Sequence, residues 1–358
     1  MKYLIQNRFS LAVMKTMDGL LRFFTRHRRE FPIEKAPQKI LVCNTGFMGD
    51  AVIATTVLPA LKKKFPDAKI GFLVASKSVP VIKELPEVTW IHSFDHGYVN
   101  KSLKQHLQTA RTALQEIRAV GYDVAINLQP YFPNGIGLLY RSKIPVRIGY
   151  ATGGLGPLLT HCVPFAGTEK YIGFAFLKLL QPLHIAAEFE SPLPYYACKQ
   201  QQTDAFVIHM GTSSELKEWP FESWKELIKL LGDRPLFFTG QGEREWERAD
   251  AACQLAKNGI NLCNRLNWRQ FVETVQQAKC LISVDSAAIH VAAAAKVPTV
   301  ALFTGIADMR LWLPPHPHCK GLIHKVLCSP CLNKRGCAFM ACIRQITPKE
   351  VLAAVKSL

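Results

Sequence analysis

The sequence contains no apolar run of about 18 residues, the length that a membrane-spanning helix requires. It also lacks the unbroken apolar stretch of a secretory leader, because Arg8, Lys15 and Asp18 interrupt the N-terminus. Neither half contains the glycine pattern G-x-G-x-x-G that opens a dinucleotide-binding dehydrogenase domain. These absences argue against a membrane-spanning protein, a secreted protein and a dehydrogenase, and we expect the chain to be cytoplasmic.

Acidic residues are scarce relative to basic ones. The 358 residues include 27 Asp and Glu against 44 Lys and Arg, a formal net charge of +17. Such an excess favours a polyanionic partner: nucleic acid, anionic lipid or a phosphorylated substrate. A zinc-stabilised nucleic-acid-binding protein is therefore one non-enzyme alternative. No nucleic-acid-binding motif is present, however, and the basic excess is concentrated at the N-terminus, so we expect no nucleic-acid partner.

Residues 1–35 combine positive charge with a helical pattern, since they hold eight Lys or Arg residues against three acidic ones. Residues 3–29 fit one amphipathic helix. Its apolar face carries Ile5, Phe9, Ala12, Val13, Met17, Leu20 and Phe24, and its polar face carries Arg8, Lys15, Asp18, Arg22, Arg26 and Arg29. Such a helix can lie in the headgroup region of an anionic leaflet, or it can pack on its own protein or a neighbouring subunit. We predict that it brings the protein to an anionic membrane surface as a peripheral protein.

From residue 39 onward, β-rich segments alternate with helical ones, which is typical of βαβ units. Strands are expected at 39–43, 70–75, 123–128, 205–210, 235–239, 280–284 and 299–303, and helices at 50–64 and 101–120. Thr347 and Glu350 form a capping box that predicts a final helix. Prolines around 181–202 separate two similar halves. We predict an N-terminal Rossmann-like domain at 36–183, a linker at 184–204 and a C-terminal Rossmann-like domain at 205–358.

Three segments lie where an expected strand gives way to an expected helix. Residues 44–50 read NTGFMGD, residues 209–213 read HMGTS with a lysine at 217, and residues 283–290 read SVDSAAIH. In open α/β sheets, ligands bind outside the carboxyl ends of the strands. We therefore expect these segments to contribute to binding sites, together with Glu243, which follows the strand at 235–239.

The segment that ends in Asp50 offers a carboxylate at the start of a helix. Asp50 is a candidate general base, or else simply the N-cap of that helix. Thr212, Ser213 and Lys217 suit a phosphate, because hydroxyl groups donate hydrogen bonds and the lysine supplies charge. On a surface loop the same residue types are ordinarily just solvated.

The third segment places small residues at a helix N-terminus. The backbone N–H groups of Ser286, Ala287 and Ala288 suit an anion, since this end of a helix carries unsatisfied donors. His290 falls one helical turn after Ser286, so it either faces the same ligand or is a buried histidine.

Taken together, these segments resemble glycosyltransferase family 9, the lipopolysaccharide heptosyltransferases, over about residues 39–357. The shared motifs are Gly-Asp at 49–50, Lys-x-Trp-Pro at 217–220, Val-Asp-Ser to His at 284–290, and Ala-Asp at 307–308 with Trp312 beyond. The resemblance implies the α/β GT-B fold, in which two Rossmann-like domains with parallel sheets face each other across a cleft. It also implies direct transfer of a heptose from the nucleotide sugar ADP-heptose to the lipopolysaccharide core or a related surface glycan. No cofactor is expected for catalysis.

The resemblance further implies roles for individual residues. Asp50 matches the general base, and Thr212, Ser213 and Lys217 match the groups on the donor phosphates. Glu243 matches the sugar or ribose contact. Asp285 and the N–H groups of residues 286–288 match the diphosphate and heptose site. Family members usually have Gly where this chain has Ala287, and Gly-Pro-Thr-Asp-Pro where it has GIADM at 305–309.

The acceptor is expected at the first domain, where Arg141, Lys143 and Arg147 suit a phosphorylated or carboxylated sugar unless they are merely a solvated surface loop. The resemblance leaves two kinds of acceptor: a lipid-linked glycan, or a protein such as an adhesin, which some relatives modify.

Four cysteines, Cys328, Cys331, Cys337 and Cys342, fall within 15 residues. Four thiolates match the ligand set of a structural zinc or iron site. Disulfides and free thiols are the alternatives. The remaining seven cysteines are scattered along the chain, and we expect them to be ordinary thiols.

Overall fold

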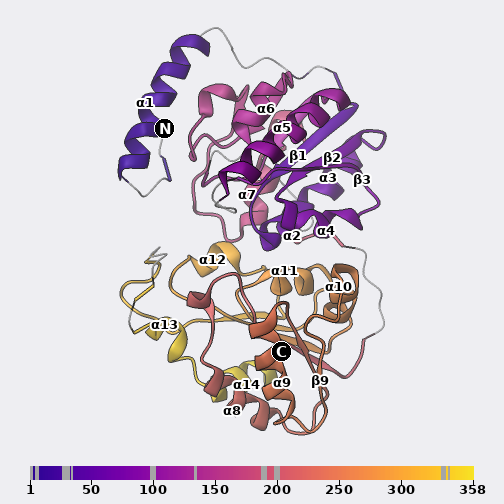
Figure 1. Ribbon diagram of the computed structural model, residues 1–358, viewed down its shortest axis with the longest axis vertical. Coiled ribbons are helices and arrows are strands. Elements are labelled where there is room, and N and C mark those ends of the chain that lie inside the picture. The colour runs from indigo at the N-terminus through magenta and orange to yellow at the C-terminus, as the bar shows by residue number, and fades with distance from the viewer. Residues whose placement is uncertain are drawn as a thin grey trace. The chain divides into compact units, whose positions relative to one another are not determined.

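The computed structural model describes residues 3–4, 8–25, 33, 35–96, 102–132, 135–186, 192–196, 202–331, 336–337 and 339–358. The chain divides into two compact units, Met1–Tyr195 and Tyr196–Leu358. In each unit, helices flank a parallel sheet (Figure 1).

The sheet of the first unit has six parallel strands in the order β3-β2-β1-β4-β5-β6. The strands are β1 (Lys39–Asn44), β2 (Lys69–Val74), β3 (Val88–Ser93), β4 (Val124–Asn127), β5 (Val146–Gly149) and β6 (His161–Cys162). The central strand β1 is buried from residue 40 onward, which explains why its sequence is a continuous apolar run rather than an alternating one. The strand order reverses between β1 and β4, and this switch point is where such sheets bind ligands.

The helices of the first unit are α1 (Arg8–Thr25), α2 (Met48–Ala54), α3 (Leu58–Lys64), α4 (Val79–Lys83), α5 (Leu103–Val120), α6 (Ile136–Arg141) and α7 (Ile172–Lys178), with short 3₁₀ turns η1 (Thr55–Val57), η2 (Ser76–Ser78), η3 (Gly156–Leu158) and η4 (Gln181–Leu183). The prediction of one helix over 50–64 was wrong. Pro59 lies in the first turn of α3, a position that tolerates the missing N–H, and the chain reaches it through the 3₁₀ turn η1.

The second unit repeats the same strand order. Its strands are β7 (Phe206–His209), β8 (Leu236–Thr239), β9 (Gly259–Asn261), β10 (Cys280–Val284), β11 (Thr299–Leu302) and β12 (Cys319–Leu322), arranged as β12-β11-β10-β7-β8-β9. Every pairing is parallel. The order reverses between β7 and β10, so this sheet also has a switch point at its first strand. The predicted pair of Rossmann-like folds is confirmed.

The second unit contains η5 (Glu215–Lys217), α8 (Phe221–Leu231), α9 (Glu243–Cys253), α10 (Trp268–Gln276), α11 (Ala287–Ala294), α12 (Met309–Trp312), α13 (Ala341–Arg344) and α14 (Pro348–Lys356). The capping box predicted for the final helix is confirmed. The Thr347 hydroxyl accepts a hydrogen bond from the Glu350 N–H at 3.2 Å, and the Glu350 carboxylate accepts one from the Thr347 N–H at 2.7 Å.

Helix α1 packs against the first unit through a side that carries a buried carboxylate. The residues turned away from solvent are Leu11, Met14, Met17, Asp18, Leu21 and Thr25. Asp18 is only 1% exposed, and it accepts hydrogen bonds from the Leu155 N–H and the Tyr3 hydroxyl, both at 2.8 Å. Burial raises the pKa of Asp18. The sequence assigns Asp18 to the polar face of this helix, and the structure covers that position with the folded unit, whose donors the carboxylate satisfies. Residues 5–7 and 26–29 of the expected helix lie outside the described residues.

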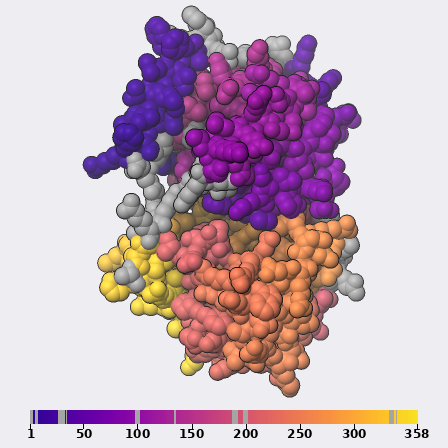
Figure 2. All heavy atoms as spheres, viewed as in Figure 1, coloured from indigo at the N-terminus to yellow at the C-terminus, as the bar shows by residue number. Residues whose placement is uncertain are grey.

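The opposite side of α1 exposes large apolar side chains. Phe9 is 79% exposed and Phe24 is 80% exposed, and Val13, Leu20 and Phe23 are exposed beside them. Arg8, Lys15 and Arg22 are exposed on the same helix. Figure 2 shows α1, in dark indigo, as a ridge on the surface of the first unit. Among the described residues, no helix is long and apolar enough to cross a membrane.

Candidate functional site

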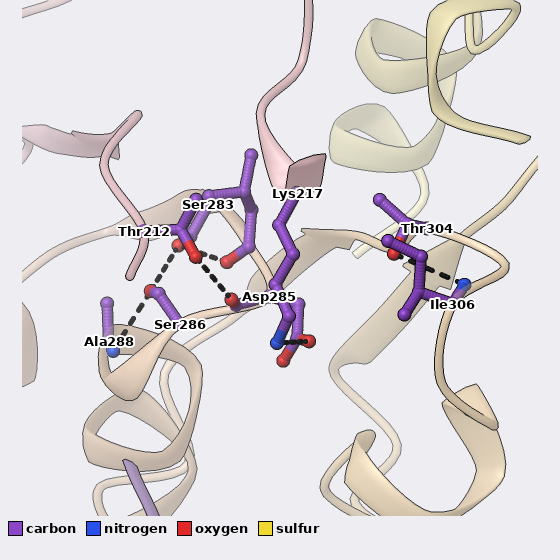
Figure 3. A network of polar contacts seen from close by, with 9 residues as sticks. Thr212, Lys217, Ser283, Asp285, Ser286, Ala288, Thr304 and Ile306 are labelled. Atoms are coloured by element: carbon purple, nitrogen blue, oxygen red, sulfur yellow. Dashed lines mark hydrogen bonds and ion pairs between the residues drawn. The ribbon is translucent and has the colours of Figure 1, made fainter. Parts of the chain in front are cut away.

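The switch point of the second sheet brings two polar loops together. Thr212 and Lys217 follow β7, and Asp285 follows β10 (Figure 3). The Lys217 Nζ lies 2.6 Å from the Asp285 Oδ2, and the Thr212 hydroxyl donates to the Asp285 carbonyl at 3.4 Å. Three residues that the sequence predicted as donor contacts therefore meet in one network. Ser213, the fourth residue from these loops, is exposed.

The N-terminus of α11 adjoins this network. Ser286 is the N-cap, and its hydroxyl accepts from the Ala288 N–H at 3.2 Å and is hydrogen-bonded to the Ser283 hydroxyl at 3.0 Å (Figure 3). Of the three N–H groups predicted to bind an anion, that of Ala288 therefore donates to the Ser286 hydroxyl. The N–H groups of Ser286 and Ala287 come before it in the chain. The helix dipole adds partial positive charge at the same end.

His290 lies one turn into α11 and is 3% exposed. Burial lowers the pKa of His290 to about 4; Asp285 opposes this shift and Lys217 adds to it. The imidazole is therefore neutral near pH 7 and contributes no positive charge to the network. Of the two interpretations that the sequence left open, the structure places His290 as a buried histidine.

The loop that carries Lys217 is held by ion pairs from α9. Glu218 lies next to the lysine, and its carboxylate pairs with Arg244 and with Arg248, the latter at 2.6 Å. Arg244 also pairs with Glu215 on the same loop. These contacts fix the backbone of η5, and so limit where the Lys217 ammonium can lie.

Sequence reasoning selected Glu243, but a different glutamate lies against the strand ends. Glu243 is the first residue of α9 and is exposed. A Cβ atom at Gly211 or at Gly240 would overlap the Glu245 side chain, which therefore fills the space beside both glycines. The Gln241 N–H donates to Glu245 Oε2 at 2.9 Å, and burial raises the pKa of Glu245. Glycines within two residues of the ends of two adjacent strands, Gly211 after β7 and Gly240 after β8, were the sequence signal that could have revealed this position.

Asp50 lies at the switch point of the first sheet. It is the third residue of α2, whose N-cap is Phe47, and both of its carboxylate oxygens accept hydrogen bonds. Its Oδ2 accepts from the Phe47 N–H at 2.8 Å, and its Oδ1 accepts from the Gln129 side-chain amide at 3.1 Å. Gln129 follows β4, so the two strands that flank the switch point both contribute. A Cβ atom at Gly46 would lie 2.6 Å from Asp50 Oδ2, and the glycine is needed to leave room for the carboxylate.

The three basic residues predicted for the acceptor have different surroundings. Arg141, at the end of α6, and Lys143 are exposed. Arg147 is 2% exposed, and its guanidinium donates to the backbone carbonyls of Ile144 and Leu158. Arg147 therefore stabilises the backbone inside the first unit. Of the three predicted acceptor contacts, only Arg141 and Lys143 have exposed side chains.

The four cysteines of the cluster differ in exposure. Cys328, Cys331 and Cys337 are exposed and Cys342 is buried, and all four are free thiols. Within the described parts of the chain, no group of three or more His, Cys, Asp or Glu residues is arranged to hold a metal ion. Residues 332–335 and 338 of the same segment lie outside the described residues.

The chain is similar to known glycosyltransferases in both sequence and structure. Residues 168–340 match the family model of glycosyltransferase family 9 (heptosyltransferase). Lipopolysaccharide heptosyltransferase 3 of Escherichia coli (strain K12) is 26% identical over 294 residues, which cover 75% of this chain and 83% of that protein. The solved structure of E. coli heptosyltransferase WaaC with ADP has a TM-score of 0.73 at 18% identity, covering 89% of this chain and 99% of that one.

A further solved structure is more distant. The iron-containing dodecameric glycosyltransferase TibC from enterotoxigenic E. coli H10407 has a TM-score of 0.53 at 11% identity, covering 90% of this chain and 76% of that one. Together with the two parallel sheets, these likenesses confirm the fold class predicted from the sequence.

Proposed function

The chain belongs to glycosyltransferase family 9 and is a glycosyltransferase, and from this premise we propose that it transfers a heptose from ADP-heptose to the lipopolysaccharide core or a related surface glycan. One observation supports this proposal above the others. The switch point of the first sheet presents a carboxylate, Asp50, whereas that of the second presents a cation, Lys217, beside a helix N-terminus. A sugar transfer needs both kinds of group, a proton acceptor for the attacking hydroxyl and positive charge for the departing diphosphate.

The proposed reaction is a direct displacement. An acceptor hydroxyl attacks the anomeric carbon of the donor, the new glycosidic C–O bond forms as the bond to the diphosphate breaks, and ADP departs. The hydroxyl proton passes to the Asp50 carboxylate. Lys217 and the N–H groups at the start of α11 stabilise the charge that develops on the diphosphate. No cofactor takes part in this scheme.

We assign the donor contacts as the sequence proposed them, except that Glu245 is added and His290 is given a supporting role. Thr212, Ser213 and Lys217 are assigned to the phosphates, and Asp285 with the start of α11 to the diphosphate and heptose. Glu243 remains the proposed ribose or sugar contact, and Glu245 is a second candidate because it lies against the glycines after β7 and β8. His290 is assigned a supporting role beneath the site.

The proposed acceptor is a lipid-linked glycan, and a protein such as an adhesin is the alternative. Arg141 and Lys143 are exposed cations that suit phosphate or carboxylate groups on such a glycan. The test compares surface glycan and surface proteins from cells with and without this chain by mass spectrometry. Loss of one heptose from the glycan supports the proposal. Loss of heptose from a protein instead selects the alternative acceptor, and loss of a different sugar overturns the donor assignment.

We also propose that the enzyme works in the cytoplasm, bound peripherally to the inner face of the inner membrane through α1. Support comes from the division of this helix into two sides. Its single acidic residue, Asp18, is buried against the protein, whereas Arg8, Lys15 and Arg22 remain exposed beside apolar side chains such as Phe9 and Phe24. An outward surface that is both apolar and cationic is complementary to an anionic leaflet.

A structural zinc or iron at the cysteine cluster is the remaining proposal. Four thiols are a suitable donor set. Two of them lie in segments that meet near Gly305: the Cys331 N–H donates to the Gly305 carbonyl at 2.8 Å, and a Cβ atom at Gly305 would lie 3.3 Å from the Cβ of Cys342. The Met340 N–H also donates to Cys337 Sγ at 3.4 Å. Such a metal would stabilise this segment and would take no part in the sugar transfer.

A further inference from the structure

Two buried side-chain amides, those of Gln129 and Asn44, lie next to Asp50. Gln129 is 5% exposed and Asn44 is 0% exposed. The Gln129 Nε2 donates two hydrogen bonds, one to Asp50 Oδ1 at 3.1 Å and one to Asn44 Oδ1 at 3.0 Å. Asn44 ends β1 and Gln129 follows β4, so the bridge joins the two strands at the switch point to the helix that carries Asp50.

The direction of each hydrogen bond in this bridge is determined by its neighbours. The Gly46 N–H donates to Asn44 Oδ1 at 3.2 Å, and the Asn44 amide nitrogen donates to the Asp50 carbonyl at 3.1 Å. Asn44 therefore presents an acceptor to Gln129. The Asp50 carboxylate is an acceptor when ionised, so both acceptors require the nitrogen of Gln129 rather than its oxygen. The amide of Gln129 cannot turn over without losing both bonds.

From this arrangement we propose that Gln129 is a positioning residue, which holds the Asp50 carboxylate in the orientation needed to receive the acceptor proton. The inference rests on the proposed function, since it assumes that Asp50 is the base. Gln129 fixes Oδ1 and the Phe47 N–H fixes Oδ2, so the carboxylate cannot rotate freely. Each oxygen keeps a further lone pair for the hydroxyl proton.

Gln129 also affects the proton affinity of Asp50. A hydrogen bond donated to a carboxylate stabilises the charged form and lowers its pKa. Loss of that bond raises the pKa, and a negative charge in its place raises the pKa further. Among the described elements packed most closely against α2, the charged residues are Lys39 of β1, Lys77 of η2, Lys83 of α4 and Lys178 of α7, all of them cations. They are the same in every variant of Gln129 and so do not alter the comparison.

The test measures turnover against pH for the full-length enzyme with Gln129→Met and Gln129→Glu. Methionine keeps the length of the side chain without its donor, and glutamate replaces the donor with a carboxylate. We expect kcat to fall about 10- to 100-fold in Gln129→Met, as is typical for loss of a hydrogen bond to a charged group, with the donor Kd unchanged. The acidic limb of the pH–rate profile should move to higher pH in the order wild type, Gln129→Met, Gln129→Glu.

Gln105→Met is the matched control. It removes an amide-to-carboxylate hydrogen bond of the same kind in the same unit, from Gln105 Nε2 to Asp95 Oδ2 at 2.7 Å. The acidic limb should not move in this variant. An unchanged limb in both Gln129 variants overturns the positioning role, even if kcat falls. Asp50→Asn separates the two hypotheses: normal turnover in that variant overturns the base assignment, whereas an inactive Asp50→Asn with unaffected Gln129 variants overturns only the present inference.

Discussion

Lys217 and Asp285 reach each other from loops that follow two different strands, with Nζ 2.6 Å from Oδ2. The pair places one cation and one carboxylate at the same switch point, beside the N-terminus of α11. Under the proposed function, the donor diphosphate would meet a lysine that is already held in position by its partner. The carboxylate remains available to a sugar hydroxyl, which can donate a hydrogen bond to it.

Lys217→Ala should weaken donor binding and slow the reaction, because the cation meets negative charge both before and during displacement. Loss of a charge-assisted hydrogen bond predicts a rise of about 10- to 100-fold in the Kd for ADP-heptose, measured by calorimetry. Lys225→Ala is the control, since it removes a surface ion pair with Glu222 in the same unit. Equal donor affinity in the two variants would contradict the assignment of Lys217.

Asp50→Asn keeps the shape of the side chain but removes the proton acceptor. Turnover should fall by about 10² to 10⁴, while the donor Kd changes little. Asp123→Asn is the matched control. It changes a carboxylate at the other end of the same strands, where Asp123 accepts hydrogen bonds from the backbone N–H groups of Gln38 and Lys39. Its turnover should remain normal. Near-normal turnover in Asp50→Asn would require another base, and Asp285 would be tested next.

The outer side of α1 should bind anionic vesicles. Replacing Phe23 and Phe24 together by serine removes exposed apolar surface without touching the packed side. Sedimentation with vesicles that contain anionic phospholipid should decrease severalfold, since each exposed aromatic contributes to interfacial binding. Leu103→Ser with Leu107→Ser, on α5, removes two leucines that are also exposed and should leave sedimentation unchanged. Equal sedimentation of both double variants would show that α1 is not the membrane-binding surface.

Acid should destabilise the second unit through His290. The pKa of this residue is lowered from 6.5 to about 4, so the unfolded chain binds a proton that the folded chain excludes. The stability contributed by neutral His290 is therefore complete above pH 6.5 and is lost as the pH falls towards about 4, by up to about 1.4 kcal/mol per pH unit. Tryptophan fluorescence during urea unfolding can follow this unit, because five of the six tryptophans lie within it. The slope of stability against pH should be shallower in His290→Gln, and identical slopes would contradict the interpretation.

The cysteine cluster should bind about one zinc or iron per chain when the protein is purified without added metal, as measured by elemental analysis. Replacing Cys328 and Cys331 by serine should remove the metal and lower the thermal stability of the second unit while the donor Kd changes little. Replacing the scattered Cys162, which is exposed, should do neither. Metal-free protein with unchanged stability would exclude the proposed site.

The fold was predictable because its signals are local. Buried parallel strands such as β1 and β10 are predominantly apolar rather than alternating, and Thr347 with Glu350 marks the start of α14. The break between α2 and α3 was missed because the apolar pattern continues through it, and only Pro59 indicates the restart.

The candidate site was predictable where a residue lies at or shortly after the end of a strand: Asp285 directly follows β10, and Asp50 and Lys217 lie in the first helical element after β1 and β7. Partners that depend on tertiary packing were not. Gln129 meets Asp50 only because β1 and β4 are adjacent, and Glu245 is selected over Glu243 by the direction in which α9 leaves β8. Asp18 illustrates the same limit, since helical periodicity assigns a residue to a face but cannot tell which face the protein will cover.

The lack of a side chain at Gly46 predicts which substitutions this enzyme tolerates at that position. The Asp50 carboxylate lies beside Gly46, and a β-carbon at position 46 would come within 2.6 Å of Asp50 Oδ2. In a library of all single substitutions, position 46 should therefore behave differently in two selections. Scored for folded abundance, alanine there should pass, because one short loop can shift to admit a methyl group. Scored for sugar transfer, it should fail almost as completely as a substitution at position 50, although glycine has no side chain with which to take part in the chemistry.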